Sequence, residues 1–176
     1  AETLEQATFA ASLVKTKYTE GKPMANLLAH LDEAFSPGQI GGSDKKPADS
    51  SENAPKAALN SAPKRVEQVY QTPIENHNAM EPHATVARWD GDRLTCWTSI
   101  QQMNWGVRDL GLIIGTPKEK IRLHSAFIGG GFGGKGTAQS DLALSAIAAR
   151  VAGRPVKLVL QRPLMFNNTI HRPKTI

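Results

Sequence analysis

Five glycines fall within the six positions 129–134, in the stretch AFIGGGFGGKGT, and Lys135 and Gly136 follow them. An apolar segment leads into this run, and an Ala/Leu-rich segment comes after it. Glycine loses more conformational freedom on folding than any other residue, so such a cluster indicates that the backbone approaches another group closely. Backbone N–H groups without covering side chains can bind phosphates and other anionic oxygens. The loop is therefore the first candidate binding site.

The loop matches the dinucleotide-binding fingerprint. Gly129, Gly131 and Gly134 satisfy G-x-G-x-x-G between an apolar segment and a helical one. A dinucleotide site also needs an acidic residue about 20 positions further on, at the tip of the next strand, to bind a ribose. The segment LVLQRP has Gln161 or Arg162 at that tip. The fingerprint is therefore incomplete.

The loop also matches most of a P-loop. Gly129, Gly134 and Lys135 satisfy G-x-x-x-x-G-K, but Gly136 replaces the Ser or Thr that binds magnesium, and Thr137 comes one position too late. The downstream apolar strand ends in glutamine instead of the aspartate that such a site needs. Two more interpretations of the loop stay open. One is a glycine turn without a ligand, and the other is a standalone α/β module whose loop binds an anionic ligand or a nucleotide.

Three other residue types could do chemistry. Glu81 and His83 flank a proline in MEPHA and could act together as catalytic bases or as metal ligands. We favour a structural role, in which Glu81 satisfies buried backbone donors. Cys96 is the only cysteine, so neither an internal disulfide nor a CxxC site can form, and its strand-like surroundings predict a buried thiol. The remaining histidines considered show no ligand spacing: His77, His124 and His171.

The composition excludes some function classes. The chain has 176 residues, a formal net charge of +5 and only 6% aromatic residues. Lys and Arg are scattered and do not alternate with aromatics, so we do not expect nucleic-acid binding. No segment approaches the roughly 20 apolar residues of a membrane-spanning helix, so we do not expect a membrane-embedded role.

The periodicity predicts a mixed α+β fold. From Ser36 to Pro63 the composition shifts to Gly, Ser, Pro, Asp, Lys and Ala, which is typical of a linker or long loop. Thr3 and Gln6 have capping-box spacing, and Ser140 and Asp141 are cap candidates. Helices are predicted at 3–14, 24–35, 102–115 and 140–153, with a turn of helix at 56–60; strands are predicted at 15–19, 65–72, 83–90, 94–100, 120–128 and 155–161, and an irregular tail at 162–176.

Several stretches together resemble one family. The order and spacing of HNAMEPHATVARWDGDRLTCWTSIQQ, IRLHSAFIGGGFGGKG, SDLALSAIAARVAGRPVKLVLQRP and NNTIHRP are similar to the molybdenum-binding subunit of the xanthine dehydrogenase/aldehyde oxidase family, most of all to large subunits of bacterial periplasmic aldehyde oxidoreductases. AETLEQATFAASLVKTKY resembles the end of the preceding hammerhead-like domain. The resemblance implies three regions: 1–35 as the end of the hammerhead-like domain, 36–63 as a linker, and 64–176 as the N-terminal part of the molybdenum-cofactor-binding domain.

The resemblance also implies roles for site residues. Gln101 lies 31 positions before Phe132 and matches a family glutamine that hydrogen-bonds an oxo or hydroxo group at molybdenum. Gln102 is the near alternative. Gly131, Phe132 and Gly133 would lie beside the metal without ligating it by thiolate, and Gly130 and Gly134 would complete the cofactor-binding segment. Lys135 would offset cofactor phosphates or be solvated. Many relatives have Glu where this chain has Gly136, so the resemblance favours aldehydes or other heterocycles over purines.

The family's general-base glutamate is expected beyond Ile176, so no catalytic base is expected in this chain, and the chain alone is expected to be inactive. The implied cofactor is molybdenum with molybdopterin, in its cytosine dinucleotide form. The implied partners are an iron–sulfur subunit and an FAD subunit, which hold those cofactors, and the implied substrate is a small aldehyde or heterocycle.

Overall fold

A computed structural model describes residues 1–40, 46–48 and 55–176. The chain divides into two compact units, Ala1–Val66 and Glu67–Ile176. Residues 41–45 and 49–54 of the predicted linker 36–63 lie outside the described residues. The finer division into regions 1–35, 36–63 and 64–176 stays a prediction.

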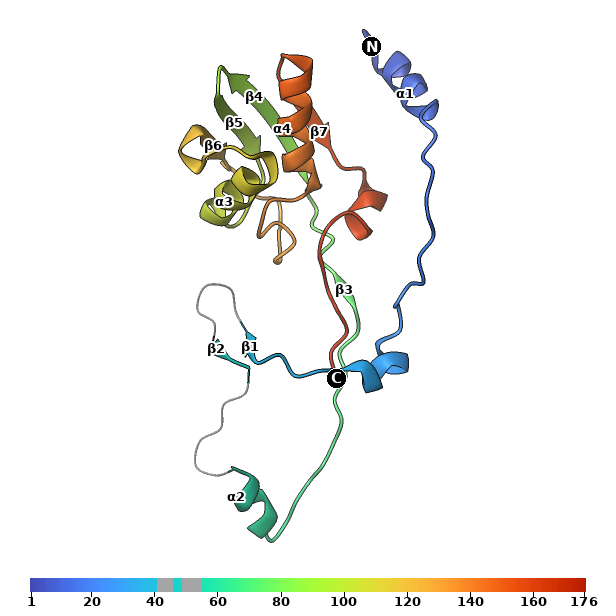
Figure 1. Cartoon of the computed structure of the whole chain (residues 1–176), viewed down its shortest axis with the longest axis vertical. Coiled ribbons are helices and arrows are strands. Elements are labelled where there is room, and N and C mark those ends of the chain that lie inside the picture. Colours follow the sequence, from blue (N-terminus) through green and yellow to red (C-terminus); the bar gives the residue numbers. More distant parts are fainter. Residues whose placement is uncertain (41–45, 49–54) are drawn as a thin grey trace. The chain divides into compact units, whose positions relative to one another are not determined.

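The first unit consists of short elements (Figure 1). Its described residues are mostly exposed. The predicted N-terminal helix is confirmed as α1 (Leu4–Ser12), and the hydroxyl of Thr3 accepts a hydrogen bond from the Gln6 amide at 3.2 Å. The strand predicted at 15–19 is wrong, because these residues form no ladder. The helix predicted at 24–35 is a shorter 3₁₀ helix. After α1, the described elements of this unit are the 3₁₀ helix (Leu27–Glu33), the antiparallel pair of β1 (Gln39–Ile40) and β2 (Lys46–Pro47), and α2 (Pro55–Ser61).

The second unit is built on a four-stranded sheet with the order β6-β5-β4-β7. The predicted Asp-Gly hairpin is confirmed, because β4 and β5 pair antiparallel on either side of Gly91, which has φ +58°. β7 pairs antiparallel with β4, and β6 runs parallel to β5. The strand bounds are Ala84–Asp90 for β4, Arg93–Thr98 for β5, Ile121–His124 for β6 and Val156–Val159 for β7.

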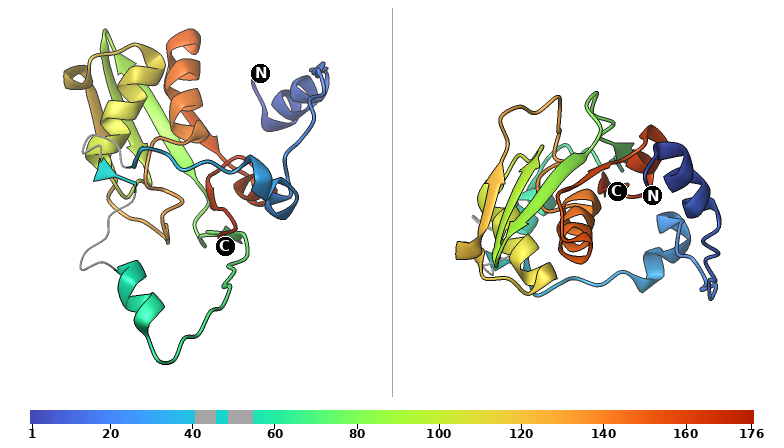
Figure 2. Two further views of the ribbon diagram at one scale, coloured as in Figure 1. Left: turned by 60° about the horizontal axis from the view of Figure 1, so that its bottom comes forward. Right: turned by 90° about the horizontal axis from the view of Figure 1, so that it is seen from above.

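Two helices cover one face of this sheet (Figure 2). Helix α3 (Met103–Ile114) ends at Gly115 and α4 (Ser140–Ala152) ends at Gly153, and both glycines have the left-handed φ that stops a helix. Alternate strand residues point toward the helices, which is why the strands show a buried–exposed alternation. The main core comprises Ala87, Leu94, Cys96, Ile100, Leu110, Ile121, Leu123, Leu142, Ala146 and Ala149.

The topology argues against the dinucleotide fingerprint. In such a fold the crossover helix joins two neighbouring parallel strands. Here α4 follows β6 and precedes β7, and these strands lie at opposite edges of the sheet with β5 and β4 between them. The Gly-rich loop therefore leaves an edge strand and does not enter a nucleotide-binding crossover.

Two more of the predicted strands differ from the structure, besides the one at 15–19. The strand at 65–72 does not form, and only Thr72 bridges to Thr175; the apolar Val69 nearby is exposed. The strand predicted at 120–128 stops at His124. There the Ser125 hydroxyl, and not a strand backbone, accepts from the Ile100 amide at 3.1 Å and donates to the Ile100 carbonyl at 3.2 Å.

The predicted caps of α4 and the irregular tail also need correction. Gln139 is the N-cap of α4, and Asp141 is instead buried, where it accepts a hydrogen bond from Thr85 at 2.7 Å. The tail holds a 3₁₀ helix (Arg162–Phe166) and a short strand β8 (His171–Arg172) that pairs with β3 (Glu75–Asn76). The predicted mixture of helices and sheet is confirmed. In the described part of the chain, no helix is long and apolar enough to cross a membrane.

Candidate functional site

The Gly-rich loop connects β6 to α4 and folds into tight turns. The Gly134 amide donates to the Gly131 carbonyl at 2.7 Å, and Gly130 and Gly133 have φ of +90° and +95°. Glycine is required at these two positions because L side chains rarely adopt such angles. Phe132 also has a positive φ, +53°, and its ring is 73% exposed. A bulky residue in this conformation is strained, and Phe132 gains little burial in return.

Other glycines of the loop make room for neighbouring side chains. A Cβ atom at Gly131 would lie 2.6 Å from the Gln101 side-chain carbon Cδ, and one at Gly129 would lie 2.5 Å from the Glu81 Cβ. Both distances are too short for real carbon contacts. The close approach indicated by the glycine content is therefore satisfied in part by side chains of this chain.

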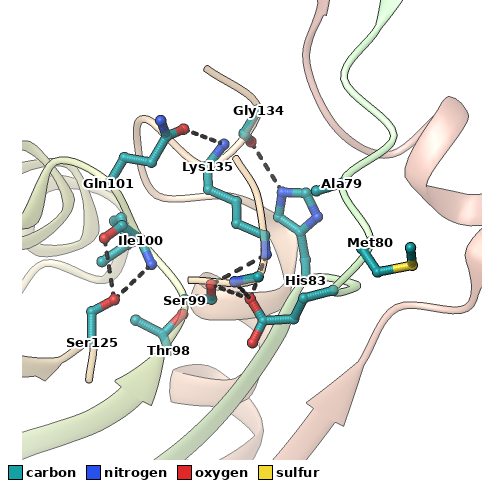
Figure 3. Close-up of polar contacts among 12 residues, drawn as sticks. Ala79, Met80, His83, Thr98, Ser99, Ile100, Gln101, Ser125, Gly134 and Lys135 are labelled. Atoms are coloured by element: carbon teal, nitrogen blue, oxygen red, sulfur yellow. Dashed lines mark hydrogen bonds and ion pairs between the residues drawn. The ribbon is translucent and has the colours of Figure 1, made fainter. Parts of the chain in front are cut away.

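Gln101 lies against the loop and is held by three hydrogen bonds, of which Figure 3 draws the one from the Lys135 amide to the Gln101 side chain. Its side-chain oxygen Oε1 accepts from the Gly133 and Lys135 amides at 3.1 and 3.2 Å, and its own amide donates to the Lys135 carbonyl at 2.8 Å. An amide group that accepts through oxygen presents its NH₂ on the other side. Gln101 is exposed, so Nε2 is available as a neutral donor. Gln102, the near alternative, is the N-cap of α3 and makes no side-chain capping bond.

A partly buried ion pair connects the loop to the segment before β4. The Lys135 ammonium lies 2.7 Å from Glu81 Oε2, and the Lys135 side chain is fully buried. The same carboxylate oxygen accepts from the Ser99 hydroxyl at 2.6 Å and from the Gly129 amide at 2.8 Å. Burial disfavours the charged carboxylate, but the hydrogen bonds from Lys135, Ser99 and Gly129 outweigh it and lower the pKa of Glu81 from 4.5 to about 2. Glu81 is therefore ionised at neutral pH.

These contacts decide between the predicted roles of Glu81 and Lys135. The structural role expected for Glu81 is confirmed in part: it accepts from the backbone amide of Gly129, but Gly129 is exposed and not a buried donor. The expectation that Lys135 is solvated is wrong, because its ammonium is buried against Glu81 and Ser99. The expectation that it offsets cofactor phosphates stays a prediction. Sequence patterns could not pair Glu81 with Lys135, since 54 positions separate them. Ser99 was missed for the same reason.

Two histidines support the other side of the loop. His83 is buried, and its Nε2 lies 3.0 Å from the Gly134 carbonyl, so this nitrogen donates the hydrogen bond. A Cβ atom at Gly134 would lie 3.0 Å from the Cβ of His77. Both histidines therefore shape the loop. Within residues 1–40, 46–48 and 55–176, no group of three or more His, Cys, Asp and Glu residues could hold a metal ion.

Cys96 does not belong to this site. Its side chain lies in the core, and burial, together with the nearby Asp141 carboxylate, raises the pKa of the thiol from 9.0 to about 12. The predicted buried thiol is confirmed. A thiol that stays protonated is a poor metal ligand.

Comparison with known proteins shows what kind of domain has this loop. A model of the molybdopterin cofactor-binding domain matches residues 43–176. The chain belongs to this family. The chain is 46% identical over all 176 residues to the aldehyde oxidoreductase molybdenum-binding subunit PaoC of Escherichia coli O157:H7, and covers 23% of that protein. It is 29% identical over 158 residues, 89% of the chain, to the xanthine dehydrogenase molybdenum-binding subunit of the same organism, and covers 21% of it.

The fold is also shared with a solved structure. Quinoline 2-oxidoreductase from Pseudomonas putida 86 is similar with a TM-score of 0.73 and 22% identity, over 97% of this chain and 22% of that one. The resemblance predicted from the sequence is therefore confirmed, and the hypothesis of a standalone anion-binding module is not favoured. The chain spans 23% of the length of the PaoC subunit, 21% of the Escherichia coli xanthine dehydrogenase subunit and 12% of the rice xanthine dehydrogenase that it matches.

The residues of the loop fit an anionic cofactor. Gly130 has no side chain over the backbone, the Gly133 amide already donates to Gln101 Oε1, and Gln101 adds a neutral NH₂ donor at the same place. Neutral N–H donors suit oxo and phosphate oxygens. Because the Lys135 charge is paired with Glu81, the fit depends on these neutral donors.

Proposed function

We propose that this chain forms one wall of the active site of a molybdenum hydroxylase, an oxidoreductase that oxidises aldehydes or N-heterocycles with oxygen derived from water. The observation that favours this function most is the Gln101 amide, which is fixed on the Gly-rich loop with its NH₂ group free to donate. Membership of the molybdopterin cofactor-binding domain family and the 46% identity to an aldehyde oxidoreductase subunit support it.

In this proposal, the chain's own residues bind and orient the cofactor. When bound, molybdopterin with molybdenum supplies the oxidation chemistry, and the protein supplies position and electrostatics. Gln101 donates a hydrogen bond from Nε2 to an oxygen acceptor beside the loop and stays neutral at all pH values. Gly130, Gly131, Gly133 and Gly134 form the proposed cofactor-binding segment, in which Gln101 and His77 occupy the space that side chains at Gly131 and Gly134 would take. Phe132, which is largely exposed, is the proposed residue that shapes the pocket beside the loop.

The proposed cofactor form is the cytosine dinucleotide of molybdopterin, as the family resemblance implies. The proposed partners are an iron–sulfur subunit and an FAD subunit that remove electrons after each turnover. A general-base glutamate would come from a part of the enzyme outside this chain. The chain alone is then expected to be inactive, because it lacks that base.

The proposed substrate is an aldehyde or a non-purine heterocycle. Many relatives have a glutamate after the loop lysine, and this chain has Gly136 there. A buried glutamate could hydrogen-bond the ring nitrogens of a purine, whereas glycine offers no such side chain. A site without this group loses most of its discrimination in favour of purines, because an unpaired polar substrate group is costly to bury.

The proposal can be tested on the protein that contains this chain, produced in a host that makes molybdenum cofactor. We expect about one molybdenum per polypeptide by mass spectrometry, release of CMP from the cofactor on acid hydrolysis, and oxidation of benzaldehyde but not of xanthine. Gln101→Ala should lower kcat about 100-fold, the typical effect of losing one preorganised donor. The control is Gln68→Ala, which changes an exposed glutamine outside the site. A protein without molybdenum, or an unaffected Gln101→Ala variant, would contradict the proposal.

A further inference from the structure

One carboxylate oxygen accepts hydrogen bonds from both ends of the Gly-rich loop. Glu81 Oε2 accepts from the Gly129 amide at 2.8 Å at the start of the loop and from the Lys135 ammonium at 2.7 Å at its end. The Ser99 hydroxyl donates to the same oxygen at 2.6 Å and lies 3.2 Å from the Lys135 ammonium. The Glu81 amide returns a bond to the Gly129 carbonyl at 2.9 Å. We call Glu81, Ser99 and Lys135 the loop bridge.

Because Lys135 is buried, its ammonium depends on the partners that the loop bridge provides. The Lys135 side chain is 0% exposed, whereas that of Glu81 is 39% exposed. A buried ammonium must keep its charge partners, because removal of one partner leaves an uncompensated charge in the interior. Lys135 can therefore stay buried only while Glu81 and Ser99 hold their present positions. The position of residue 135 along the loop is fixed as a result.

The same residue controls Gln101 through its backbone. The Lys135 amide donates to Gln101 Oε1 at 3.2 Å, and the Lys135 carbonyl accepts from the Gln101 amide at 2.8 Å. A shift of Lys135 would move both groups that orient the Gln101 amide. The loop bridge and Gln101 are thus connected through a single residue (Figure 3).

We propose that the loop bridge is a positioning device that sets the direction of the Gln101 NH₂ group toward the bound cofactor. This inference rests on the function proposed above. Glu81, Ser99 and Lys135 touch the loop and Gln101, and act on the reaction only through them. None of the three belongs to the hydrophobic core between the sheet and its helices. Disruption of the loop bridge therefore misplaces Gln101 while the domain stays folded.

The key variant is Lys135→Met in the assembled molybdenum enzyme. It removes the buried charge and keeps most of the side-chain volume, and the Glu81 carboxylate that remains can be hydrated because it is partly exposed. The matched control is Lys120→Met, which makes the same chemical change at an exposed ion pair with Asp92. Lys135→Arg tests whether another cation at this position preserves kcat. Ser99→Ala removes one hydroxyl without altering charge.

The readouts separate positioning from folding. We expect Lys135→Met to retain molybdenum, to lower kcat for benzaldehyde about 10- to 100-fold with KM changed less than about twofold, and to alter the Mo(V) EPR spectrum. Misplacement of a site group by about 1 Å can have an effect of this size. Hydrogen exchange of the 129–136 amides should accelerate at least about tenfold. Lys120→Met should change none of these, Lys135→Arg should recover part of kcat, and Ser99→Ala should lower kcat about threefold.

The inference is overturned if Lys135→Met keeps the kcat, EPR spectrum and amide exchange of the wild type. If Lys135→Met fails to fold, Ser99→Ala decides, and a wild-type kcat and spectrum in that variant would likewise overturn it. If the wild-type enzyme holds no molybdenum, the proposed function fails and the inference fails with it. A loaded, active wild type with unaffected bridge variants refutes the inference alone.

Discussion

Replacement of Gly131 by alanine should release Gln101 from the loop. The new Cβ would lie 2.6 Å from Gln101 Cδ and 2.7 Å from Oε1, whereas ordinary contacts begin at 3.4 Å. The Gln101 amide must therefore move by about 1 Å, since optimal carbon contacts lie near 3.5–4.0 Å. This displacement breaks the hydrogen bonds from the Gly133 and Lys135 amides.

The magnitude follows from these two bonds. Each contributes about 1 kcal/mol, so the local structure loses about 2 kcal/mol. Because 1.4 kcal/mol is a factor of ten, the Gly133 and Lys135 amides should exchange about 30-fold faster with solvent deuterium. The assay is amide exchange resolved by NMR or by fragmentation mass spectrometry. Gly38→Ala is the control, because a Cβ at Gly38 meets no atom within 4 Å.

A double mutant tests the cause directly. Gln101→Ala removes the side chain with which the new methyl group collides. Gly131→Ala combined with Gln101→Ala should therefore exchange no faster than Gln101→Ala alone, a strong non-additivity between touching residues. If the two substitutions add independently, or if Gly131→Ala leaves both amides protected, the steric argument is refuted.

Four further predictions concern other groups. Cys96 should resist iodoacetamide at pH 8 in the folded protein and react in guanidinium, as measured by mass spectrometry, because its pKa is raised to about 12. Asp141→Ala should lower the free energy of unfolding by about 2 kcal/mol through loss of a buried hydrogen bond from a threonine hydroxyl, whereas Ser140→Ala, with a weak exposed bond, should change it by less than about 0.5 kcal/mol. Phe132→Asn should raise the free energy of unfolding by about 0.5 kcal/mol, because asparagine tolerates the positive φ and the exposed ring loses little burial; an unchanged or lower value in urea unfolding would contradict the strain. Folding lowers the pKa of Glu81 from 4.5 to about 2, so its ionised form stabilises the folded state above pH 4.5, and the stability of the wild type relative to Glu81→Gln should decline as pH falls from 4.5 toward 2; equal pH profiles would refute this.

Local patterns predicted the elements that depend on nearby residues. The hairpin at Gly91 and the helix ends at Gly115 and Gly153 follow from glycine at positions with a left-handed φ. The strand predicted at 65–72 had the right alternation but no sheet to join, apart from the bridge at Thr72. Alternation indicates which face could be buried, but only a neighbouring strand completes the hydrogen bonds.

The residues of the candidate site could be predicted from the sequence, but the contacts among them could not. The sequence alone indicated that the backbone at 129–134 approaches another group, because so many glycines lose entropy on folding. The resemblance linked Gln101 to that loop. The direction of the Gln101 amide depends on which loop amides reach Oε1, and this is a property of the folded chain.

The sequence by itself determined the mixed fold and the buried Cys96, because composition and short-range spacing encode these features, whereas the identity of the Gly-rich loop came from its resemblance to a known family. The tertiary structure alone decided that Lys135 is buried against Glu81, since the two residues are 54 positions apart and no periodicity relates them. It also decided that two loop glycines make room for Glu81 and Gln101. Contacts between distant segments depend on how the sheet edge, the loop and the strand ends come together, and only the folded chain specifies that arrangement.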